Sequence, residues 1–484
     1  MAPSLTIEAD VAVVGAGAAG LYAALTAASA GSRVALVSAT PLAQSASYWA
    51  QGGLAAVLAL DDTRERHLED TLRAGRGTVR RSAAEILTRA APAAVRDLEA
   101  LGVHFDADRR GRLALGLEGG HSVRRIVHAG GAATGRRITR QLSALVAEHP
   151  RIDVLEDCRA TALPTRAGRC AGVRLHDERV VSARAVVLAT GGAAALWSRT
   201  TNPAGAVGAG MVLAHAAGAA LADLEMMQFH PTAVAGLEGV DGFLVTEAVR
   251  GEGALLLDAD GERFVEELAP RDEVALAVAR RMQETGATSV GLDMRRVDPA
   301  LFPNVVAVLR RAGLDPTREL VPVAPAAHYT MGGIATDLEG RATLPGLYAV
   351  GECACTGLHG ANRLASNSLS ECFVFGRRAA LAALAEPPPS AAPEPGPGLP
   401  RPALTDASRD ALWKHAGIER DAAGLRTLLD DPHPLVRLVG ACALAREESR
   451  GAHLRRDFPA RDPALDEHHT VVRADDQPVC EHWA

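Results

Sequence analysis

The stretch Val11-Ala12-Val13-Val14-Gly15-Ala16-Gly17-Ala18-Ala19-Gly20 decides the fold of this 484-residue chain. Residues 7–14 predict a buried parallel strand, residues 21–30 an alanine-rich helix and residues 33–37 a second strand, so the glycines stand inside a βαβ unit. In such a unit the first glycine allows a tight turn, the second lets a pyrophosphate approach the backbone, and the third packs helix against strand. The N-terminus of the helix attracts the anion. The sequence therefore predicts a Rossmann-like α/β domain that binds a dinucleotide.

Two later segments repeat the pattern of a buried strand that ends in glycine. Residues 185–192 end in Thr190-Gly191-Gly192, and residues 346–352 end in Gly351-Glu352. Three such strands suit FAD, whose adenosine, pyrophosphate and ribityl parts each need a contact. The acidic residue that usually follows the second strand is replaced by Ser38, which argues against a free NAD-binding domain.

Arginine supplies almost all of the positive charge, because Lys414 is the only lysine among 51 basic residues. This excludes a phosphate-binding loop with its lysine and a kinase-type catalytic lysine, and it leaves only Lys414 for Schiff-base chemistry. A GC-rich genome explains the bias most simply. The net charge of −7 and the lack of a basic stripe argue against nucleic-acid binding.

Cysteine usage favours a reducing, cytoplasmic setting, since the seven cysteines are irregularly spaced and no secretory signal is recognisable. Cys353 and Cys355 have no second pair nearby, so we expect buried thiols and no metal site. Residues 11–32 are uncharged and long enough to cross a bilayer, but their glycine pattern favours a nucleotide site over a membrane span.

Composition shifts along the chain predict several parts. Charged residues become more frequent at 224–329, which we interpret as an inserted capping domain that interrupts a nucleotide domain of residues 1–223 and 330–386. Residues 387–402 are proline-rich and predict a semi-rigid linker. Amphipathic patterns at 406–416 and 434–449 predict a helical C-terminal domain at 403–484.

Several loops combine histidine and arginine with glycine or proline, a combination that suits a small dicarboxylate. His230, in a Gln-Phe-His-Pro turn, is a ligand candidate, whereas His121 favours a structural role. Two alternatives stay open at this point. Arg250 could form a local ion pair with Glu252, and Arg271 could cap a helix and pair with Asp272.

The chain up to about residue 380 resembles the fumarate reductase/succinate dehydrogenase flavoprotein superfamily, and within it the L-aspartate oxidases. The resemblance rests on residues 45–53, 118–126, 228–232, 246–254, 267–272, 325–333 and 356–371, with a C-terminal motif at 449–453 and 457–459. It implies a Rossmann-like FAD-binding domain with an inserted α+β capping domain and a C-terminal helical domain.

The resemblance also implies noncovalent FAD, because Ala46 stands where membrane-complex relatives attach the flavin to a histidine. Together with the glycine motifs it places FAD contacts at Gly15, Ala16, Gly17, Ala18, Ala19, Gly20, Ser38, Ser45, Ala46, Ser47, Tyr48, Trp49, Ala50, Gln51, Gly52, Gly53, Ala160, Thr161, Thr190, Gly191, Gly192, Glu352, Asn367, Ser368 and Leu369. Ala209 replaces the aspartate of the family's Gly-Asp-Gly, so an acidic contact to FAD is missing, and the loop between Phe264 and Glu267 is shortened.

The activity that the resemblance implies is oxidation of L-aspartate to iminoaspartate, the first step of quinolinate and NAD biosynthesis, with the flavin reoxidised by O2 or fumarate. Glu118, in a Glu-Gly-Gly-His-Ser stretch typical of aspartate oxidases, would attract the substrate ammonium. The other expected roles are carboxylate binding by His230, Thr246, His328 and Arg363, acid/base chemistry by Arg271, a second arginine at Arg250, and polar support from Gln228 and Glu247.

Two other functions stay open. One is a soluble fumarate reductase or succinate-oxidising flavoprotein, against which Glu118 and Ala46 argue. The other is a flavin-binding subunit that serves assembly or channelling to a partner such as quinolinate synthase.

Overall fold

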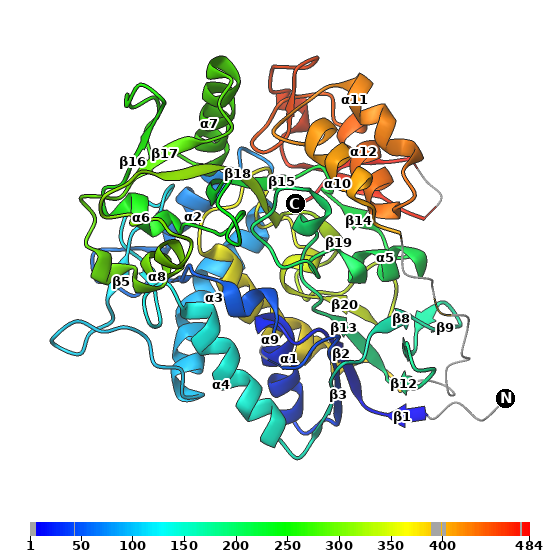
Figure 1. The fold of residues 1–484 in the computed structure, drawn as a ribbon. Coiled ribbons are helices and arrows are strands. Elements are labelled where there is room, and N and C mark those ends of the chain that lie inside the picture. The colour runs from blue at the N-terminus through cyan, green and yellow to red at the C-terminus, as the bar shows by residue number, and fades with distance from the viewer. Residues whose placement is uncertain (1–5, 43, 389–397, 399–402, 475–476) are drawn as a thin grey trace.

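The computed structural model describes residues 6–42, 44–388, 398, 403–474 and 477–484 (Figure 1). At its centre lies a parallel five-stranded sheet in the order β20-β13-β2-β3-β7. Its strands are β2 (Val11–Val14), β3 (Val34–Val37), β7 (Ile152–Leu155), β13 (Ala185–Leu188) and β20 (Leu347–Ala349). The three strands predicted to end in glycine, β2, β13 and β20, are neighbours, so their carboxyl ends share one edge of the sheet, where such folds bind ligands.

Helices and a second sheet cover the two faces of this sheet. On one face a hydrophobic core joins it to the helices α1 (Ala18–Ser29), α3 (Arg81–Ala100), α4 (Thr134–Glu148) and α9 (Asn367–Ala383), with α2 (Arg64–Ala74) beside α3. Another core joins the opposite face to the sheet of β1 (Thr6–Glu8), β12 (Val180–Ser182), β11 (Gly172–Leu175) and β8 (Ala160–Ala162). The nucleotide-binding part is therefore built of three layers.

The prediction of one strand over residues 7–14 was wrong, because the chain changes sheets within it. β1 pairs with β12, whereas β2 pairs with β3 and β13. Asp10 lies at the change: its carboxylate accepts a hydrogen bond from the backbone N–H of Arg33 at 2.8 Å and pairs with Arg184. The first helix also begins three residues earlier than predicted, because Gly17 is its N-cap.

A separate antiparallel sheet, in the order β15-β18-β17-β16, occupies the segment predicted as a capping domain. It consists of β15 (Met227–Val234), β16 (Leu255–Leu257), β17 (Val290–Asp293) and β18 (Val321–Thr330), with α6 (Glu247–Gly251), α7 (Arg271–Thr285) and α8 (Pro303–Arg311). These elements share a core of their own. Figure 1 shows them in green at the upper left, with β15 and β18 running towards the centre.

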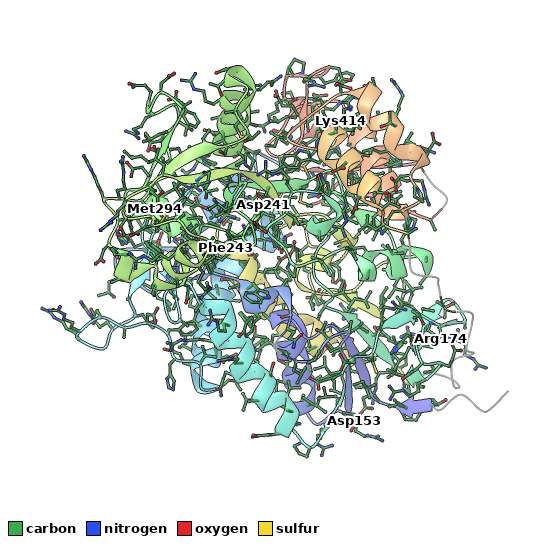
Figure 2. The ribbon with its side chains drawn as sticks, viewed as in Figure 1. Asp153, Arg174, Asp241, Phe243, Met294 and Lys414 are labelled. Atoms are coloured by element: carbon green, nitrogen blue, oxygen red, sulfur yellow. The ribbon has the colours of Figure 1, made fainter. Side chains whose placement is uncertain are left out.

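The tail forms the predicted helices as α10 (Asp406–His415) and α12 (Pro434–Ala445), with α11 (Ala422–Thr427) between them. Its described residues also contain strands that were not predicted, of which the longest are β24 (His468–Val472) and β25 (Val479–His482). They extend a sheet with β14 (Leu221–Ala222), β19 (Gly333–Ala335) and β21 (Ala354–Cys355). α12 ends four residues short of its predicted end, where the buried Arg446 pairs with Glu225 and Glu448. Lys414 lies exposed on α10 (Figure 2).

The remaining strands are short. They are β4 (Leu54–Ala55), β5 (Leu115–Gly116) and β6 (Ile126–Val127), which form a three-stranded sheet, and the pairs β9 (Thr165–Arg166) with β10 (Arg169–Cys170) and β22 (Glu419–Arg420) with β23 (Leu454–Arg455). Most of the predicted proline-rich linker falls outside the described residues. Across the described part of the chain, no helix has the length and apolar character needed to span a membrane.

Candidate active site

The turn after β2 contains glycines with two different surroundings. A Cβ at Gly15 would lie 2.2 Å from the carbonyl oxygen of Ala189, and one at Gly20 would lie 1.9 Å from that of Gly15, so both are needed for close packing. At Gly17 a Cβ would meet only the hydroxyl of Ser47, at 3.2 Å, among the described residues. The same hydroxyl accepts a hydrogen bond from the N–H of Ala18. The N-terminus of α1 thus opens onto a polar cradle that fits a pyrophosphate.

Glu352, just after β20, supplies a half-buried carboxyl group at the same edge. It accepts a hydrogen bond from the N–H of Thr330 at 2.9 Å. A Cβ at Gly192 would lie 2.1 Å from its Oε1, so only glycine admits this side chain. Burial raises the pKa of Glu352 to about 7. The nearby Thr190 hydroxyl is buried without a partner among the described residues. These polar groups fit the hydroxyls of a ribityl chain.

The segment predicted to line the flavin, residues 45–53, contacts both the capping segment and the turn before α9. Gln51 donates to the carbonyl oxygen of Leu244 in the capping segment, and the N–H of Gly53 donates to Ser366 at 3.1 Å. Ala46 begins a short 3-10 helix and offers no nucleophile for a flavin bond. Ser38 and Thr161 were predicted to lie near the adenosine part of FAD. The Ser38 hydroxyl donates to the carbonyl oxygen of Thr40, and the Thr161 hydroxyl donates to the carbonyl oxygen of Arg174.

Gln228 on β15 joins the predicted acid/base arginine, Arg271, to the predicted carboxylate-binding arginine, Arg363. Its side-chain oxygen accepts hydrogen bonds from Nη1 of Arg271 at 3.2 Å and from Nε of Arg363 at 3.1 Å. Its amide nitrogen donates to Asn362 and to the carbonyl oxygen of Arg363. Burial together with Arg271 lowers the pKa of Arg363 to about 10. Its Nη2 has no hydrogen-bond partner among the described residues, so one donor remains for an anion.

Glu247 on α6 lies between Arg271 and Arg250. It accepts a hydrogen bond from Nε of Arg271 at 2.6 Å, and its other oxygen lies 3.7 Å from Nη2 of Arg250. Thr246, the other candidate from this loop, is the buried residue just before α6. All three charged side chains are buried. Arg271 and Glu247 are joined by a hydrogen bond and Glu247 and Arg250 by an ion pair alone, so the three groups form a row of buried charges that leads away from Gln228.

The two local ion pairs considered from the sequence do not form. Arg250 pairs with Glu247, whereas Glu252 lies 4.0 Å from Arg124. Arg271 is the first residue of α7 and points to Glu247. Asp272, one residue later, instead binds Arg76, whose Nε lies 2.8 Å from its carboxylate. Neighbours in sequence on a helix point in different directions, which separates these pairs.

His230 and His328 face each other across β15 and β18, with ring centroids 5.1 Å apart. The β15 ladder is irregular at His230, and such bulges redirect side chains. Burial and the nearby Arg271 hold the pKa of both histidines well below the usual value, so both are neutral. Nδ1 of His230 accepts from the N–H of Thr232, which places the proton on Nε2, a nitrogen without a partner among the described residues.

Glu118 provides a buried negative charge beside these groups. Its carboxylate accepts a 2.7 Å hydrogen bond from the Ser366 hydroxyl and lies 3.7 Å from His128. A Cβ on the next residue, Gly119, would lie 2.0 Å from Glu247, so the loop packs directly on the arginine cluster. Burial opposes ionisation, but His128, Ser366 and Arg271 outweigh it and hold the pKa of Glu118 at about 2.

Sequence reasoning missed Ser366 and the supports of Arg363. The Arg363 guanidinium lies over the ring of Tyr329, 4.5 Å from its centroid, and the Tyr329 hydroxyl contacts His359 and Glu371. The motif at 356–371 contains most of these residues, but residue type alone does not distinguish support from contact. His121 agrees with its structural interpretation, since its ring nitrogens contact Arg125 and the carbonyl oxygen of Ala365.

Cys353 and Cys355 are buried, as predicted. Cys355 donates to Asp223, which also binds His469 of the tail at 2.5 Å. Among the described residues these three are spaced closely enough to hold a metal ion, but they already satisfy one another by hydrogen bonding.

Comparison with known proteins agrees with this geometry. The FAD binding domain family matches residues 10–369, and the fumarate reductase flavoprotein C-terminal family matches residues 433–482. The chain is 48% identical to an L-aspartate oxidase of Caulobacter vibrioides, covering 95% of each chain, and 45% identical to one of Streptomyces coelicolor, covering 98% of this chain and 92% of that one. A solved structure of E. coli quinol fumarate reductase FrdA superposes with a TM-score of 0.87 at 28% identity, covering 99% and 96% of the two chains. The chain therefore belongs to the L-aspartate oxidase family of FAD-dependent flavoproteins.

Proposed function

We propose that this protein oxidises L-aspartate to iminoaspartate with noncovalently bound FAD. The observation that carries the proposal is the ionised Glu118 beside a cluster of carboxylate-binding donors. A substrate with two carboxylates and one ammonium has charges that complement this arrangement. Succinate has the carboxylates but not the ammonium, so Glu118 would repel it.

Four groups hold the substrate carboxylates in this proposal: His230 on β15, His328 on β18, Thr246 just before α6 and Arg363 in the loop after β21. Nη2 of Arg363 and Nε2–H of His230 have no partner among the described residues, so both donors are available to the substrate. Because both imidazoles are neutral, they donate without adding charge that Glu118 would have to balance. Binding both ends of the substrate fixes its Cα–H bond in one direction, which is a positioning effect.

Bound FAD supplies the oxidising power by accepting a hydride from the substrate Cα. Glu118 attracts the ammonium but is a poor base, since a group with a pKa of about 2 does not retain a proton at neutral pH. Arg271 faces the site with its Nε and Nη1 already bound to Glu247 and Gln228. In this proposal, protons pass between the site and its surroundings along Arg271, Glu247 and Arg250.

The same resemblance supports the wider setting. O2 or fumarate takes the electrons from the reduced protein, and the product enters quinolinate and NAD synthesis in the cytoplasm. Since iminoaspartate hydrolyses readily in water, quinolinate synthase is the proposed partner that consumes it.

An anaerobic titration tests the proposal. L-Aspartate should bleach the absorbance of the bound flavin, whereas D-aspartate and succinate at equal concentration should not. Bleaching by succinate without bleaching by L-aspartate would favour a fumarate reductase or succinate-oxidising enzyme. A purified chain that stays colourless after reconstitution with FAD would favour the assembly or channelling role.

A further inference from the structure

Arg76 and Gly77 form a turn just after α2 in which both residues are left-handed, with φ angles of +58° and +84°. An arginine rarely adopts a positive φ, so the surrounding structure must hold this one in place. Two residues of the tail do so. The carbonyl oxygen of Arg76 accepts from Nη1 of Arg450 at 2.7 Å, and that of Gly77 accepts from the N–H of Glu467 at 2.8 Å.

The same turn packs against the loop after β21. The side-chain nitrogen of Asn362 donates to the carbonyl oxygen of Ala74 at 3.1 Å, and the N–H of Ala361 donates to that of Gly75 at 3.1 Å. This loop carries Arg363, one of the proposed substrate-binding groups. The position of the turn is therefore fixed relative to the active site as well as to the tail.

The Arg76 side chain reaches the capping segment. Its Nε and Nη2 lie 2.8 and 3.0 Å from the two carboxylate oxygens of Asp272, and Nη2 also contacts Glu273. A two-point contact of this kind has one defined geometry. Only 7% of the Asp272 side chain is exposed, so its charge needs a partner. Burial lowers the pKa of Arg76, but the hydrogen bonds to Asp272 and Glu273 outweigh it and raise the pKa above its usual value.

Asp272 lies in the first turn of α7, directly after Arg271. The body of this helix packs in the core of the capping segment through Val274 and Val278. Apolar contacts are non-directional and leave the rotation of a helix about its axis loosely defined. Successive residues of an α-helix project about 100° apart, so partners for both Arg271 and Asp272 determine that rotation. The active-site groups hold the first side chain, and Arg76 holds the second.

We propose that Arg76 is a positioning residue for the oxidation: by binding Asp272 it fixes the rotation of α7 at its start, and with it the direction in which the Arg271 guanidinium faces the substrate. A small rotation of α7 would move Arg271 away from Gln228 but leave the carboxylate-binding groups on β15 and β18 in place. The proposal rests on the function proposed above, in which Arg271 takes part in proton transfer.

Rapid anaerobic mixing of the FAD-bound protein with saturating L-aspartate tests it. Asparagine tolerates a positive φ, so Arg76→Asn removes the guanidinium and keeps the turn. We expect flavin reduction to slow by about tenfold to 100-fold, the loss that follows a displacement of about 1 Å in a reacting group. The KM for L-aspartate should change by less than about threefold, and the flavin should stay bound. Asp272→Asn, which leaves the turn untouched, should slow the reaction to a similar extent.

A double variant separates this role from general support of the fold. Arg76→Asn combined with Asp272→Asn should be no more than about threefold slower than the slower single variant, because both changes break the same contact. Arg280→Gln is the matched control. It also removes an ion pair between α7 and another part of the chain, to Glu419 at 2.9 Å, but further along the helix, so it should leave the rate of flavin reduction unchanged.

Three results would overturn the proposal. They are a rate for Arg76→Asn within about twofold of that of the unaltered protein, full additivity in the double variant, and equal slowing by Arg280→Gln. If the unaltered protein is not reduced by L-aspartate, the proposed function itself fails.

Discussion

Each buried charge in the active site lies beside a charge of opposite sign, and Glu247 is the clearest example. Its carboxylate is the partner of both Arg271 and Arg250, and none of the three side chains is exposed. Removing one partner from a buried ion pair leaves an uncompensated charge, which costs more than the pair gains. We therefore expect the behaviour of both arginines to depend on Glu247.

Replacing Glu247 with glutamine should lower kcat for L-aspartate by about 100-fold or more, the usual contribution of a proton-transfer group. The flavin should stay bound, because Glu247 contacts none of the residues that form its cradle. Rapid-mixing measurement of flavin reduction checks this directly. Glu266→Gln is the control, since its side chain is 74% exposed and lies 4.0 Å from Arg263. A kcat for Glu247→Gln within about twofold of the unaltered protein would contradict the role.

Buried histidines predict how stability depends on pH. Burial lowers the pKa of His67, His121, His230, His328 and His453. In the unfolded chain each histidine binds a proton below about pH 6.5, whereas the same histidine in the folded protein stays neutral. The free energy of unfolding is therefore highest above that pH and falls below it. The loss reaches about 1.4 kcal/mol per pH unit for each group. Glu352 has the opposite effect on stability. Burial raises its pKa to about 7, so it binds a proton more readily in the folded protein and adds stability as the pH falls.

Urea unfolding at pH 7.5, 6.5 and 5.5 measures this loss. The free energy of unfolding should fall from the first pH to the last, and His67→Gln should make the fall shallower. A free energy that is unchanged or higher at pH 5.5 would show that the histidines bind protons in the folded state.

Residue types and motif spacing predicted most of the site's chemical groups, but not their pairing. Gln228 lies 43 residues from Arg271 and 135 from Arg363, and it meets both only because β15, the start of α7 and the loop after β21 converge. The left-handed backbone conformation of Ser366, with φ at +60°, could not be predicted from the sequence either, because serine rarely adopts a positive φ. Pairing of this kind follows from tertiary packing.

At the scale of elements, the glycines in the turn between β2 and α1 have two different roles. Gly15 and Gly20 are needed for close packing, whereas Gly17 borders the space proposed for the pyrophosphate. Gly17→Ala should fold with a melting temperature close to that of the unaltered protein but retain little FAD, because the added methyl group occupies the cradle. Gly20→Ala should be strongly destabilised, since its Cβ would overlap the backbone of Gly15. Flavin absorbance and thermal unfolding measure the two effects. Gly205→Ala, at an open site, is the control. Similar flavin contents for Gly17→Ala and Gly205→Ala would contradict the cradle.

Element prediction succeeded where the hydrophobic period was strong and failed where tertiary contacts decide. The core strands and α1 follow from runs of valine and alanine. The division of residues 7–14 depends on Asp10 meeting Arg33 and Arg184, which lie far along the chain. β24 pairs with the edge of β14 and β25 pairs with β24, and no local pattern in the tail predicts that edge.

At the scale of the molecule, the tail and the nucleotide domain share one core. Leu412, Leu425 and Val436 of the tail pack in the same cluster as Trp197 and Met211. The buried Arg446 adds ion pairs to Glu225 and Glu448, and it receives support from Thr470. The tail should therefore stay attached without a covalent connection.

A chain cut at a protease site introduced between residues 388 and 403 should migrate as one species in size-exclusion chromatography and keep its flavin. Adding Arg446→Met should destabilise the protein by about 3–5 kcal/mol, because the buried Glu225 loses its cationic partner, whereas Glu448 keeps Arg450. The exposed Arg437→Met, on the same helix, is the control. Separation of the fragments without Arg446→Met would show that the shared core is too weak to hold them.

The solitary lysine on α10 also has a practical consequence. Lys414 follows Trp413, whose ring lies 5.9 Å from that of Phe229 on the strand that carries Gln228 and His230. Reagents that acylate amines find this one side chain and the terminal amine, so a sensor surface or a fluorophore can be attached without touching the arginine cluster. A probe there would report on the docking of the tail against β15. Enzymes that acetylate or ubiquitinate lysine side chains have one possible target in this sequence, Lys414.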